Sequence, residues 1–291
     1  MSDSLSFEDR LPQTRSGWQA LLDALVIRPS KGLGQNFLFD REIVQRLVES
    51  LDVTSADRLL EIGPGLGILT EELLRRARHV SAIELDRRLA AHLHATFGDL
   101  PQFDLHEGDA LKVDLSTVIN REEPYLVAAN LPYSVATAVL RRLLETDHHP
   151  ARLALMMQKE VAERLVARPP EMTIVGIASQ FYAVTEIAFT VDRSVFIPPP
   201  KVESAVVLLE THPSLALPVS EHAKMFKIIN AGFRHKRKQI ANSIADEFSA
   251  SKADITDWIV ATGIDPMRRA QTLDVDEWVA LTKQAPQSLV P

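Results

Sequence analysis

Short apolar runs alternate with longer segments of helical periodicity between about residue 58 and residue 160. Such alternation is typical of a parallel sheet that is covered by helices on both faces. The runs are also too apolar for strands that face water on one side. We therefore predict a doubly wound, Rossmann-like α/β architecture. The expected strands are 58–62 (RLLEI), 79–84 (HVSAIE), 103–106 (FDLH), 125–129 (YLVAA) and 153–158 (LALMMQ), with helices near 68–77, from 87 and from 135.

The N-terminal extension, residues 1–30, carries apolar side chains at helical spacing. They are Trp18, Leu21, Leu22 and Leu25. This spacing predicts one amphipathic helix that packs on the main domain, which we place at 31–211.

The C-terminal part begins with the segment 212–219, whose two prolines predict a linker. Residues 220–285 show only helical periodicity, the last helix is expected to begin near Asp274 and Glu277, and the predicted domain extends over 220–291. We therefore predict a small all-α domain after the linker.

Cysteine is absent from the 291 residues, which excludes disulfides, cysteine-ligated zinc and thiolate catalysis. The His, Asp and Glu residues form no cluster with metal-ligand spacing, so no metal is expected. An unbroken apolar run of about 18 residues and a signal-peptide pattern are also lacking. We expect a cytoplasmic protein that has no contact with membranes and acts as a monomer.

The charge pattern is acidic overall but locally basic. The net charge is -7, which argues against a protein coated in basic charge. Residues 234–238 (RHKRK) nevertheless form the densest positive run. This run is either a nucleic-acid contact or a solvated helix face. Smaller basic groups are Arg141, Arg142, Lys159, Arg164 and Arg168.

A glycine-rich turn, 61–67 (EIGPGLG), follows the first expected strand and opens a helix. Its glycines let the backbone pass close to a ligand at the carboxyl edge of the sheet. The spacing differs from the G-x-G-x-x-G of dinucleotide-binding proteins, which presents a helix N-terminus to a pyrophosphate. An acidic residue, Glu61, also precedes the first glycine. The turn, including Gly63 and Gly65, therefore suits a zwitterionic or cationic ligand such as S-adenosylmethionine.

Two more acidic residues follow the next two expected strands. Glu84 ends the second strand, where its carboxylate can accept hydrogen bonds from both ribose hydroxyls. Asp109 follows the third, where it can accept one from the amino group of an adenine. Taken singly, each acid has an alternative role as a helix cap or a solvated loop charge. Three acids after three consecutive strands favour a shared cofactor site.

The stretch 127–135 (VAANLPYSV) ends the fourth expected strand with an amide. The side-chain oxygen of Asn130 and a main-chain carbonyl near Leu131 or Pro132 can accept the two N–H groups of an adenine N6 amine, which localises the nitrogen lone pair. Proline fixes the turn. The ring of Tyr133 can stack on an extruded base. Alternatively, Asn130 caps the helix from 135, the proline starts that helix, and the tyrosine packs in the core.

With these motifs the chain resembles the ribosomal RNA adenine dimethyltransferases, in particular those of the bacterial small subunit. The resemblance covers nearly the whole chain. It includes 31–40 (KGLGQNFLFD), 156–165 (MMQKEVAERL), 195–207 (VFIPPPKVESAVV) and 233–244 (FRHKRKQIANSI), besides the glycine turn and 128–134 (AANLPYS).

The resemblance implies roles for individual residues. Asn36 and Leu38 border the cofactor, Gly63 lies under its methionine part, and Glu84, Asp109 and Asn130 have the roles inferred above. Phe196 matches the aromatic residue that closes on the target base opposite Tyr133. Composition alone would place Phe196 in the core. The implied phosphate contacts are Lys201, Arg234, Lys236, Arg237 and Lys238.

The implied reaction uses S-adenosylmethionine to convert two adjacent adenosines to N6,N6-dimethyladenosine. These adenosines lie in a hairpin loop near the 3′ end of 16S rRNA in the small ribosomal subunit, and loop bases can be extruded at modest cost. One alternative is an antibiotic-resistance methyltransferase that acts on large-subunit rRNA. The segment 198–204 (PPPKVES) and the expected basic helix argue against it. A second alternative is an assembly factor that binds the small subunit without catalysis. A DNA adenine methyltransferase would need a separate recognition domain, which we do not find.

The chain departs from the family pattern at 167–176 (ARPPEMTIVG), where many relatives carry a loop with glycine and tyrosine. Pro169, Pro170 and Glu171 add rigidity and a negative charge, which puts RNA contact by this loop in doubt.

Overall fold

The computed structural model describes residues 10–28, 35–132 and 135–286. They pack as two compact units. The sheet unit comprises Met1–Ala162 and Glu186–Thr211, and the helical unit comprises Glu163–Thr185 and His212–Pro291. The helical unit therefore includes a segment from within the predicted range 31–211. The predicted domain boundaries stay a prediction.

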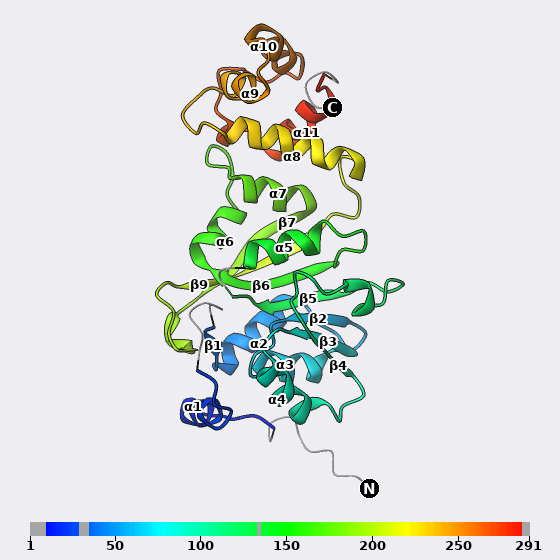
Figure 1. Ribbon diagram of the computed structural model, residues 1–291, viewed down its shortest axis with the longest axis vertical. Helices are drawn as coiled ribbons and strands as arrows, with labels where there is room; N and C mark the ends of the chain where they lie inside the picture. The colour runs from blue at the N-terminus through cyan, green and yellow to red at the C-terminus, as the bar shows by residue number, and fades with distance from the viewer. Residues whose placement is uncertain (1–9, 29–34, 133–134, 287–291) are drawn as a thin grey trace. The chain divides into compact units, whose positions relative to one another are not determined.

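The sheet unit is built on a central sheet with the strand order β4-β3-β2-β5-β6-β9-β7 (Figure 1). The first five of these strands pair in parallel and match the five predicted runs. β9 is antiparallel to β6. The doubly wound prediction is confirmed, while β7 and β9 were not predicted. The strands are β2 (Arg58–Ile62), β3 (His79–Glu84), β4 (Phe103–Glu107), β5 (Leu126–Asn130), β6 (Arg152–Gln158), β7 (Ala183–Val191) and β9 (Ser204–Thr211).

As predicted, helices α3, α4 and α5 each connect two parallel strands, whereas α2 precedes β2 and α6 follows β6. The bounds of these helices are α2 (Arg41–Ser50), α3 (Ile68–Arg76), α4 (Arg87–Phe97), α5 (Ala136–Leu144) and α6 (Lys159–Leu165), with short 3₁₀ turns η2 (Leu115–Thr117) and η3 (Arg193–Val195). Local sequence sets their starts: the Asp40 side chain accepts from the N–H of Ile43 to cap α2. α3 instead begins at Gly67, which has no side-chain cap. The glycine turn therefore opens a helix.

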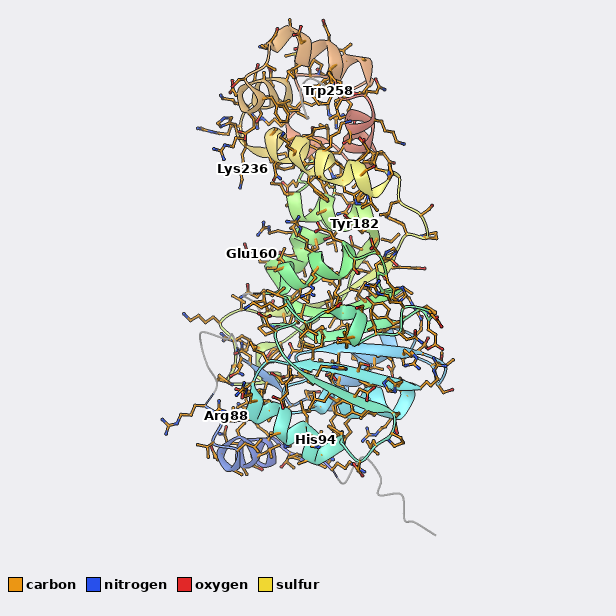
Figure 2. All side chains as sticks on the ribbon, turned by 45° about the vertical axis from the view of Figure 1, so that its right-hand side comes forward. Arg88, His94, Glu160, Tyr182, Lys236 and Trp258 are labelled. Atoms are coloured by element: carbon orange, nitrogen blue, oxygen red, sulfur yellow. The ribbon has the colours of Figure 1, made fainter. Side chains whose placement is uncertain are left out.

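The N-terminal extension forms α1 (Arg15–Ala24), with Trp18 and Leu22 buried as predicted. Arg10 holds it to the end of α4 by donating to the carbonyl of Thr96 at 2.5 Å and to the carboxylate of Asp99. At the other end, Arg88 donates to the carbonyl of Val26 at 3.0 Å (Figure 2). The extension is thus fixed to both ends of α4.

A separate two-stranded ladder joins two segments that are far apart in the sequence. β1 (Phe37–Leu38) pairs antiparallel with β8 (Phe196–Ile197), and Leu38 lies opposite Phe196. The ladder brings residues 37–38 of the GQNFL motif next to residues 196–197 of the VFIPPP motif, a pairing that we did not predict.

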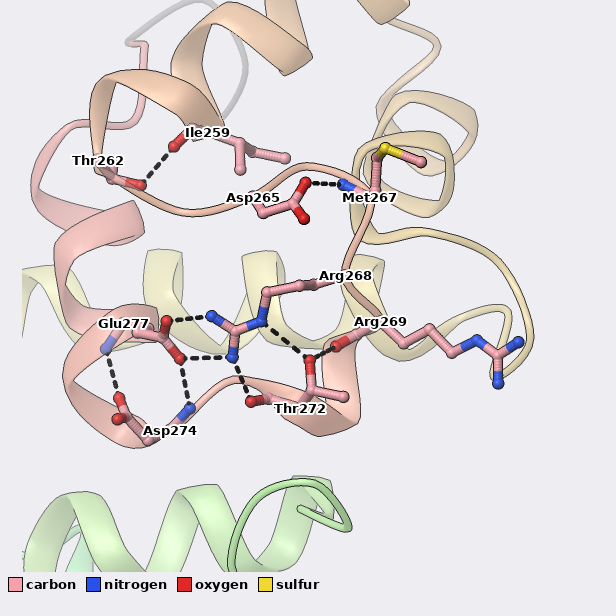
Figure 3. Close-up of polar contacts among 9 residues, drawn as sticks. All are labelled: Ile259, Thr262, Asp265, Met267, Arg268, Arg269, Thr272, Asp274 and Glu277. Atoms are coloured by element: carbon pink, nitrogen blue, oxygen red, sulfur yellow. Dashed lines mark hydrogen bonds and ion pairs between the residues drawn. The ribbon is translucent and has the colours of Figure 1, made fainter.

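The helical unit contains α7 (Ile174–Tyr182), α8 (Val219–Phe233), α9 (Ile240–Phe248), α10 (Lys252–Ala261), η4 (Ala270–Thr272) and α11 (Val275–Lys283). The predicted start of the last helix is confirmed by a capping box between Asp274 and Glu277. Arg268 donates to the same Glu277 carboxylate and to the carbonyl of Thr272 (Figure 3). A half-buried ion pair therefore fixes the loop before α11.

The basic run is not helical, so that prediction was wrong. Residues 234–239 form an irregular turn between α8 and α9. The N–H of Ile240, which begins α9, donates to the carbonyl of Arg268 at 2.7 Å. Like charges three and four residues apart, such as those of Arg237 and Lys238 relative to Arg234, disfavour a helix, and this tertiary contact starts α9 separately. Among the described residues, no helix is both long and apolar enough to span a membrane.

Candidate functional site

A cavity of about 220 Å³ lies in the sheet unit at the carboxyl ends of β2, β3 and β5. This edge is where open α/β sheets bind ligands. Most of the residues predicted for cofactor binding and catalysis line this cavity. They are Asn36, Leu38, Gly63, Gly65, Glu84, Asn130, Leu131, Pro132 and Phe196. Tyr133 lies outside the described residues, and Asp109 does not line the cavity.

The glycine turn forms the floor of the cavity in a backbone conformation that suits glycine. Gly63 and Gly65 have φ angles of 68° and 61°, in the left-handed region. A Cβ atom on Gly65 would also stand 3.4 Å from the ring of Phe37. The turn is anchored to β3 because the N–H of Gly63 donates to the carbonyl of Ile83 at 2.9 Å. Any side chain on Gly65 would strain this turn.

Glu84 ends β3 and is almost fully buried. One carboxylate oxygen accepts from the N–H of Gly65 at 3.0 Å, and the other accepts from the N–H of Asp86 at 2.9 Å. Burial raises the pKa of Glu84, and the main-chain donors oppose that shift. A carboxylate has about four acceptor positions, so Glu84 can still bind a ligand hydroxyl besides its main-chain donors.

Glu61 lies one residue before the end of β2 and also lines the cavity. Its side chain is 1% exposed, and one carboxylate oxygen has no hydrogen-bond partner among the described residues. Burial raises its pKa to about 8, and the neighbouring Glu84 carboxylate adds to the shift. An ionised carboxylate oxygen that is buried without a partner is costly unless the group is protonated or a cation binds it. Glu61 is one of the three acids that the sequence places at a shared cofactor site, without a specific contact of its own.

Asn130 ends β5 and faces the cavity. The N–H of Leu131 donates to the carbonyl of Met156 at 3.0 Å, which holds the chain against β6 beyond the strand. No described residue hydrogen-bonds to the Asn130 side chain. α5 begins after Val135 without a side-chain cap, so the alternative in which Asn130 caps this helix is wrong. The amide therefore remains able to bind a ligand.

Asp109 follows β4 at the same edge of the sheet but is engaged in a turn. Its carboxylate accepts from the N–H of Leu111 at 2.9 Å, and its carbonyl accepts from the N–H groups of Lys112 and Val113. The turn adjoins β3, since the N–H of Gly108 donates to the carbonyl of Glu84 at 2.8 Å. Contact between Asp109 and an adenine stays a prediction.

Phe196 combines the two roles considered for it. Its side chain is 1% exposed and belongs to the main hydrophobic core, yet it also lines the cavity. The ladder between β1 and β8 places it there.

The predicted phosphate contacts lie outside the cavity. Lys201 is exposed on the sheet unit. The basic turn, residues 234–238, is exposed on the helical unit, where Lys236 projects toward solvent (Figure 2). Lys238 pairs with Asp246 at 2.5 Å, and Arg234 pairs with Glu247 at 3.5 Å. Lys236 and Arg237 have no ion pair with a described residue.

An additional exposed cation, Arg269, belongs to the loop that adjoins the basic turn through the bond between Ile240 and Arg268. Its side chain extends away from the Arg268 network (Figure 3). Sequence reasoning missed Arg269 because it lies far along the chain from the basic run.

Two of the smaller basic groups are satisfied internally. Arg168 donates to the side-chain oxygen of Gln180 at 2.6 Å, and Lys159 pairs with Glu203 at 2.8 Å. Within the described ranges, no three His, Cys, Asp or Glu side chains are grouped so that they could hold a metal ion.

The chain matches the family model of the ribosomal RNA adenine dimethylases over residues 28–286. A relative from Dehalococcoides mccartyi, named ribosomal RNA small subunit methyltransferase A, is 35% identical over 270 residues, or 93% of each protein.

Two solved structures share the fold. A dimethyladenosine transferase from Plasmodium falciparum has a TM-score of 0.73 at 23% identity, and the similarity covers 84% of this chain and 95% of that protein. The 23S rRNA methyltransferase ErmE has a TM-score of 0.68 at 24% identity, covering 86% of this chain and 99% of that enzyme.

Proposed function

Since the chain belongs to the ribosomal RNA adenine dimethylase family, we propose that it dimethylates N6 of two adjacent adenosines in small-subunit rRNA. The target is a hairpin loop near the 3′ end of 16S rRNA, and the methyl donor is S-adenosylmethionine. The observation that carries this proposal is the position of Asn130, whose side chain lines the same cavity as the glycine turn and Glu61.

The residues that line the cavity support S-adenosylmethionine as the cofactor. This cofactor supplies a methyl group on a sulfonium, and the sulfur leaves as a neutral thioether. The buried carboxylate oxygen of Glu61 that lacks a partner suits the cationic amino group of the methionine part. Gly63 and Gly65 let the backbone approach the ligand closely, and Glu84 offers its remaining acceptor capacity to the ribose hydroxyls. Asn36 and Leu38 complete the wall.

Asn130 orients the target amine. Its side-chain oxygen accepts one N–H of adenine N6, and a main-chain carbonyl at Leu131 or Pro132 accepts the other. Both acceptors disfavour delocalisation of the nitrogen lone pair into the ring, which makes the amine more nucleophilic. Methylation acidifies the remaining N–H, so water or these same oxygens can take the proton late. No dedicated general base is required.

Phe196 supports the target base from the ladder between β1 and β8. Its ring is held by core packing, so it is presented rigidly. Tyr133, from the segment that follows Asn130, is proposed as the opposite face of this aromatic clamp. A base extruded from an RNA loop can stack between two such rings.

RNA phosphates are proposed to contact the basic turn and Lys201. Lys236 and Arg237 are the strongest candidates because their charges are not neutralised by described acidic side chains, and Arg269 extends the same surface. Phosphate contacts of this kind orient the RNA rather than read its sequence. We infer a cytoplasmic location from the ribosomal substrate, and we expect the protein to act as a monomer.

Two other functions predict different outcomes. The 23S rRNA methyltransferase ErmE has the same fold as this chain, so the fold alone does not distinguish a small-subunit from a large-subunit substrate. The name of the Dehalococcoides relative favours the small subunit. An assembly factor would bind small subunits whether or not it transfers methyl groups.

The deciding experiment incubates the protein with isotopically labelled S-adenosylmethionine and small or large ribosomal subunits that lack the modification. Mass spectrometry of rRNA fragments should locate label as dimethyladenosine at two adjacent positions in 16S rRNA. Label confined to 23S rRNA would support the large-subunit alternative. Binding to the small subunit without label would support the assembly-factor alternative.

A further inference from the structure

Arg142 lies on α5 and points its guanidinium group at the turn that carries Asp109. It donates to the carbonyl of Ala110 at 3.0 Å and to the carbonyl of Val113. Both acceptors are main-chain oxygens of the segment 109–113. The Arg142 side chain therefore holds this turn by hydrogen bonds from α5, the helix that follows the Asn130 segment.

This use of an arginine contrasts with that of its neighbour. Arg141 on the same helix is exposed, with 69% of its side chain accessible, and pairs with Glu145 at 2.7 Å. Arg142 is half-buried and has no ion pair with any described acidic side chain. Its charge is directed inward to two carbonyl groups, so the basic pair 141–142 is not simply a solvated or RNA-facing patch.

The turn 109–113 lies at the edge of the sheet where the cofactor is proposed to bind. The carboxylate of Asp109 is fixed within the turn by the N–H of Leu111, and Gly108 is joined to Glu84 at 2.8 Å. Glu84 in turn holds Gly65. The turn 109–113 is thus connected by hydrogen bonds to the residues that shape the cavity. Arg142 hydrogen-bonds to the other side of this turn.

We propose that Arg142 is a positioning residue that sets the nucleobase specificity of the cofactor site by holding Asp109 in register with Glu84. The inference rests on the proposed function and on the contact predicted from the sequence, in which Asp109 accepts a hydrogen bond from the 6-amino group of the cofactor adenine. Without Arg142 the carbonyl groups of Ala110 and Val113 lose their donor, the turn shifts, and the carboxylate of Asp109 no longer selects for an amino group.

The test compares two ligands that differ in the 6-substituent of the purine and in the proton on N1. S-adenosylhomocysteine carries a 6-amino donor, whereas its inosine analogue carries a carbonyl acceptor that the Asp109 carboxylate repels. Isothermal titration calorimetry should show that the wild-type protein prefers the adenosine compound by roughly tenfold to a hundredfold. Arg142→Met should reduce this preference by about tenfold, and Arg141→Met, the matched control, should retain it.

The conservative variant Arg142→Lys can reach one carbonyl at a time, so it should give an intermediate preference. It also serves if Arg142→Met does not fold, which thermal unfolding would reveal. A general loss of stability would weaken both ligands equally and leave their ratio unchanged. Wild-type preference in a folded Arg142→Met or Arg142→Lys variant would overturn the proposal, as would weaker RNA binding with an unchanged ligand ratio.

Asp109→Asn separates this inference from its premise. If Asp109→Asn loses the preference and Arg142→Met keeps it, the role of Arg142 is wrong and the role of Asp109 stands. If the wild-type protein itself binds both ligands equally, both roles are overturned. Methyl transfer to 16S rRNA is measured separately, so the proposed function is tested independently.

Discussion

The Glu84 carboxylate accepts a hydrogen bond from the main-chain N–H of Gly65 at 3.0 Å. Glu84 lies at the end of β3, and Gly65 lies in the turn after β2. The residue that is proposed to hold the cofactor ribose therefore also shapes the turn that is proposed to lie beneath the methionine part. Ligand binding and the conformation of the cavity floor depend on one side chain.

Glu84→Ala should weaken both the fold and ligand binding. The substitution leaves the N–H groups of Gly65 and Asp86 without their acceptor, and each buried unpaired donor costs about 1–3 kcal/mol. Thermal unfolding and calorimetry with S-adenosylhomocysteine measure the two effects. Glu107→Ala removes the exposed residue opposite Glu84 in the ladder and should change neither. Unaltered affinity in Glu84→Ala would contradict the proposed ribose contact.

Glu61→Gln should stabilise the free protein at alkaline pH. Burial raises the pKa of Glu61 to about 8 from an ordinary value of 4.5, so between these values the folded state binds more protons than the unfolded state. The contribution of Glu61 to the free energy of unfolding therefore falls as the pH rises through this window, by up to about 1.4 kcal/mol per pH unit. Glutamine cannot ionise and removes this dependence.

Thermal unfolding near pH 6 and near pH 9 measures this difference. The stability gain of Glu61→Gln over the wild type should be larger at the higher pH, while the exposed Glu160→Gln should show no such trend (Figure 2). Glu61→Gln should also bind S-adenosylhomocysteine more weakly, because it lacks the carboxylate that faces the ligand ammonium group. An equal gain at both pH values would show that Glu61 is ionised throughout.

Asn130→Ala should lower the turnover number by roughly a hundredfold or more, since it removes an acceptor that acts on the reacting amine. Cofactor affinity should change little, because the glycine turn, Glu61 and Glu84 remain. Single-turnover methyl transfer to small subunits and calorimetry separate the two quantities. Asn120→Ala, at an exposed amide, is the control. Near-normal turnover in Asn130→Ala would remove Asn130 from the mechanism.

Phe196→Leu should raise the KM for rRNA by about tenfold, because base stacking on an aromatic ring contributes about 1–3 kcal/mol. Leucine retains most of the buried apolar volume, whereas Phe196→Ala would cost about 3–5 kcal/mol of stability. Phe103→Leu tests the general effect of replacing a core ring, since Phe103 is buried but does not line the cavity. Equal KM values for the two leucine variants would argue against the clamp.

The double variant Lys236→Gln, Arg237→Gln should weaken small-subunit binding and reduce the salt dependence of log Kd by about two units of slope, because each phosphate contact releases about one counterion. Lys238→Gln should have a smaller effect, since Asp246 already neutralises Lys238 at 2.5 Å. Filter binding over a range of salt concentrations measures both slopes. An unchanged slope in the double variant would place the RNA elsewhere.

The parallel core could be predicted because each of its strands is an apolar run bounded by a helical pattern. β5 is buried at every residue before Asn130, so both its faces are covered and its sequence is continuously apolar. The carboxyl-edge position of Glu61, Glu84 and Asn130 follows from parallel strands. The position of the Asp109 carboxylate does not, because it depends on the local turn with Leu111.

Long-range contacts account for what the sequence did not predict. The ladder of β1 and β8 has two residues in each strand, which is too short to produce a periodic pattern. The basic turn was taken for a helix because Phe233 and Ile240 are seven residues apart, which preserves helical spacing across the break. Only the contact between Ile240 and Arg268 reveals a new helix start.

The site is built on two separate sheets, the central sheet and the ladder of β1 and β8. Asn130 and Glu84 extend from the central sheet, whereas Phe196 extends from a ladder in which β8 pairs with β1. Changes in the ladder can therefore move the ring of Phe196 while the hydrogen-bond acceptors Asn130 and Glu84 keep their positions. Because Leu38 of the same ladder lines the cofactor cavity, an evolutionary change in the ladder would alter recognition of the acceptor nucleotide together with one wall of the donor site, while the contacts of Glu84 and Asn130 are inherited unchanged.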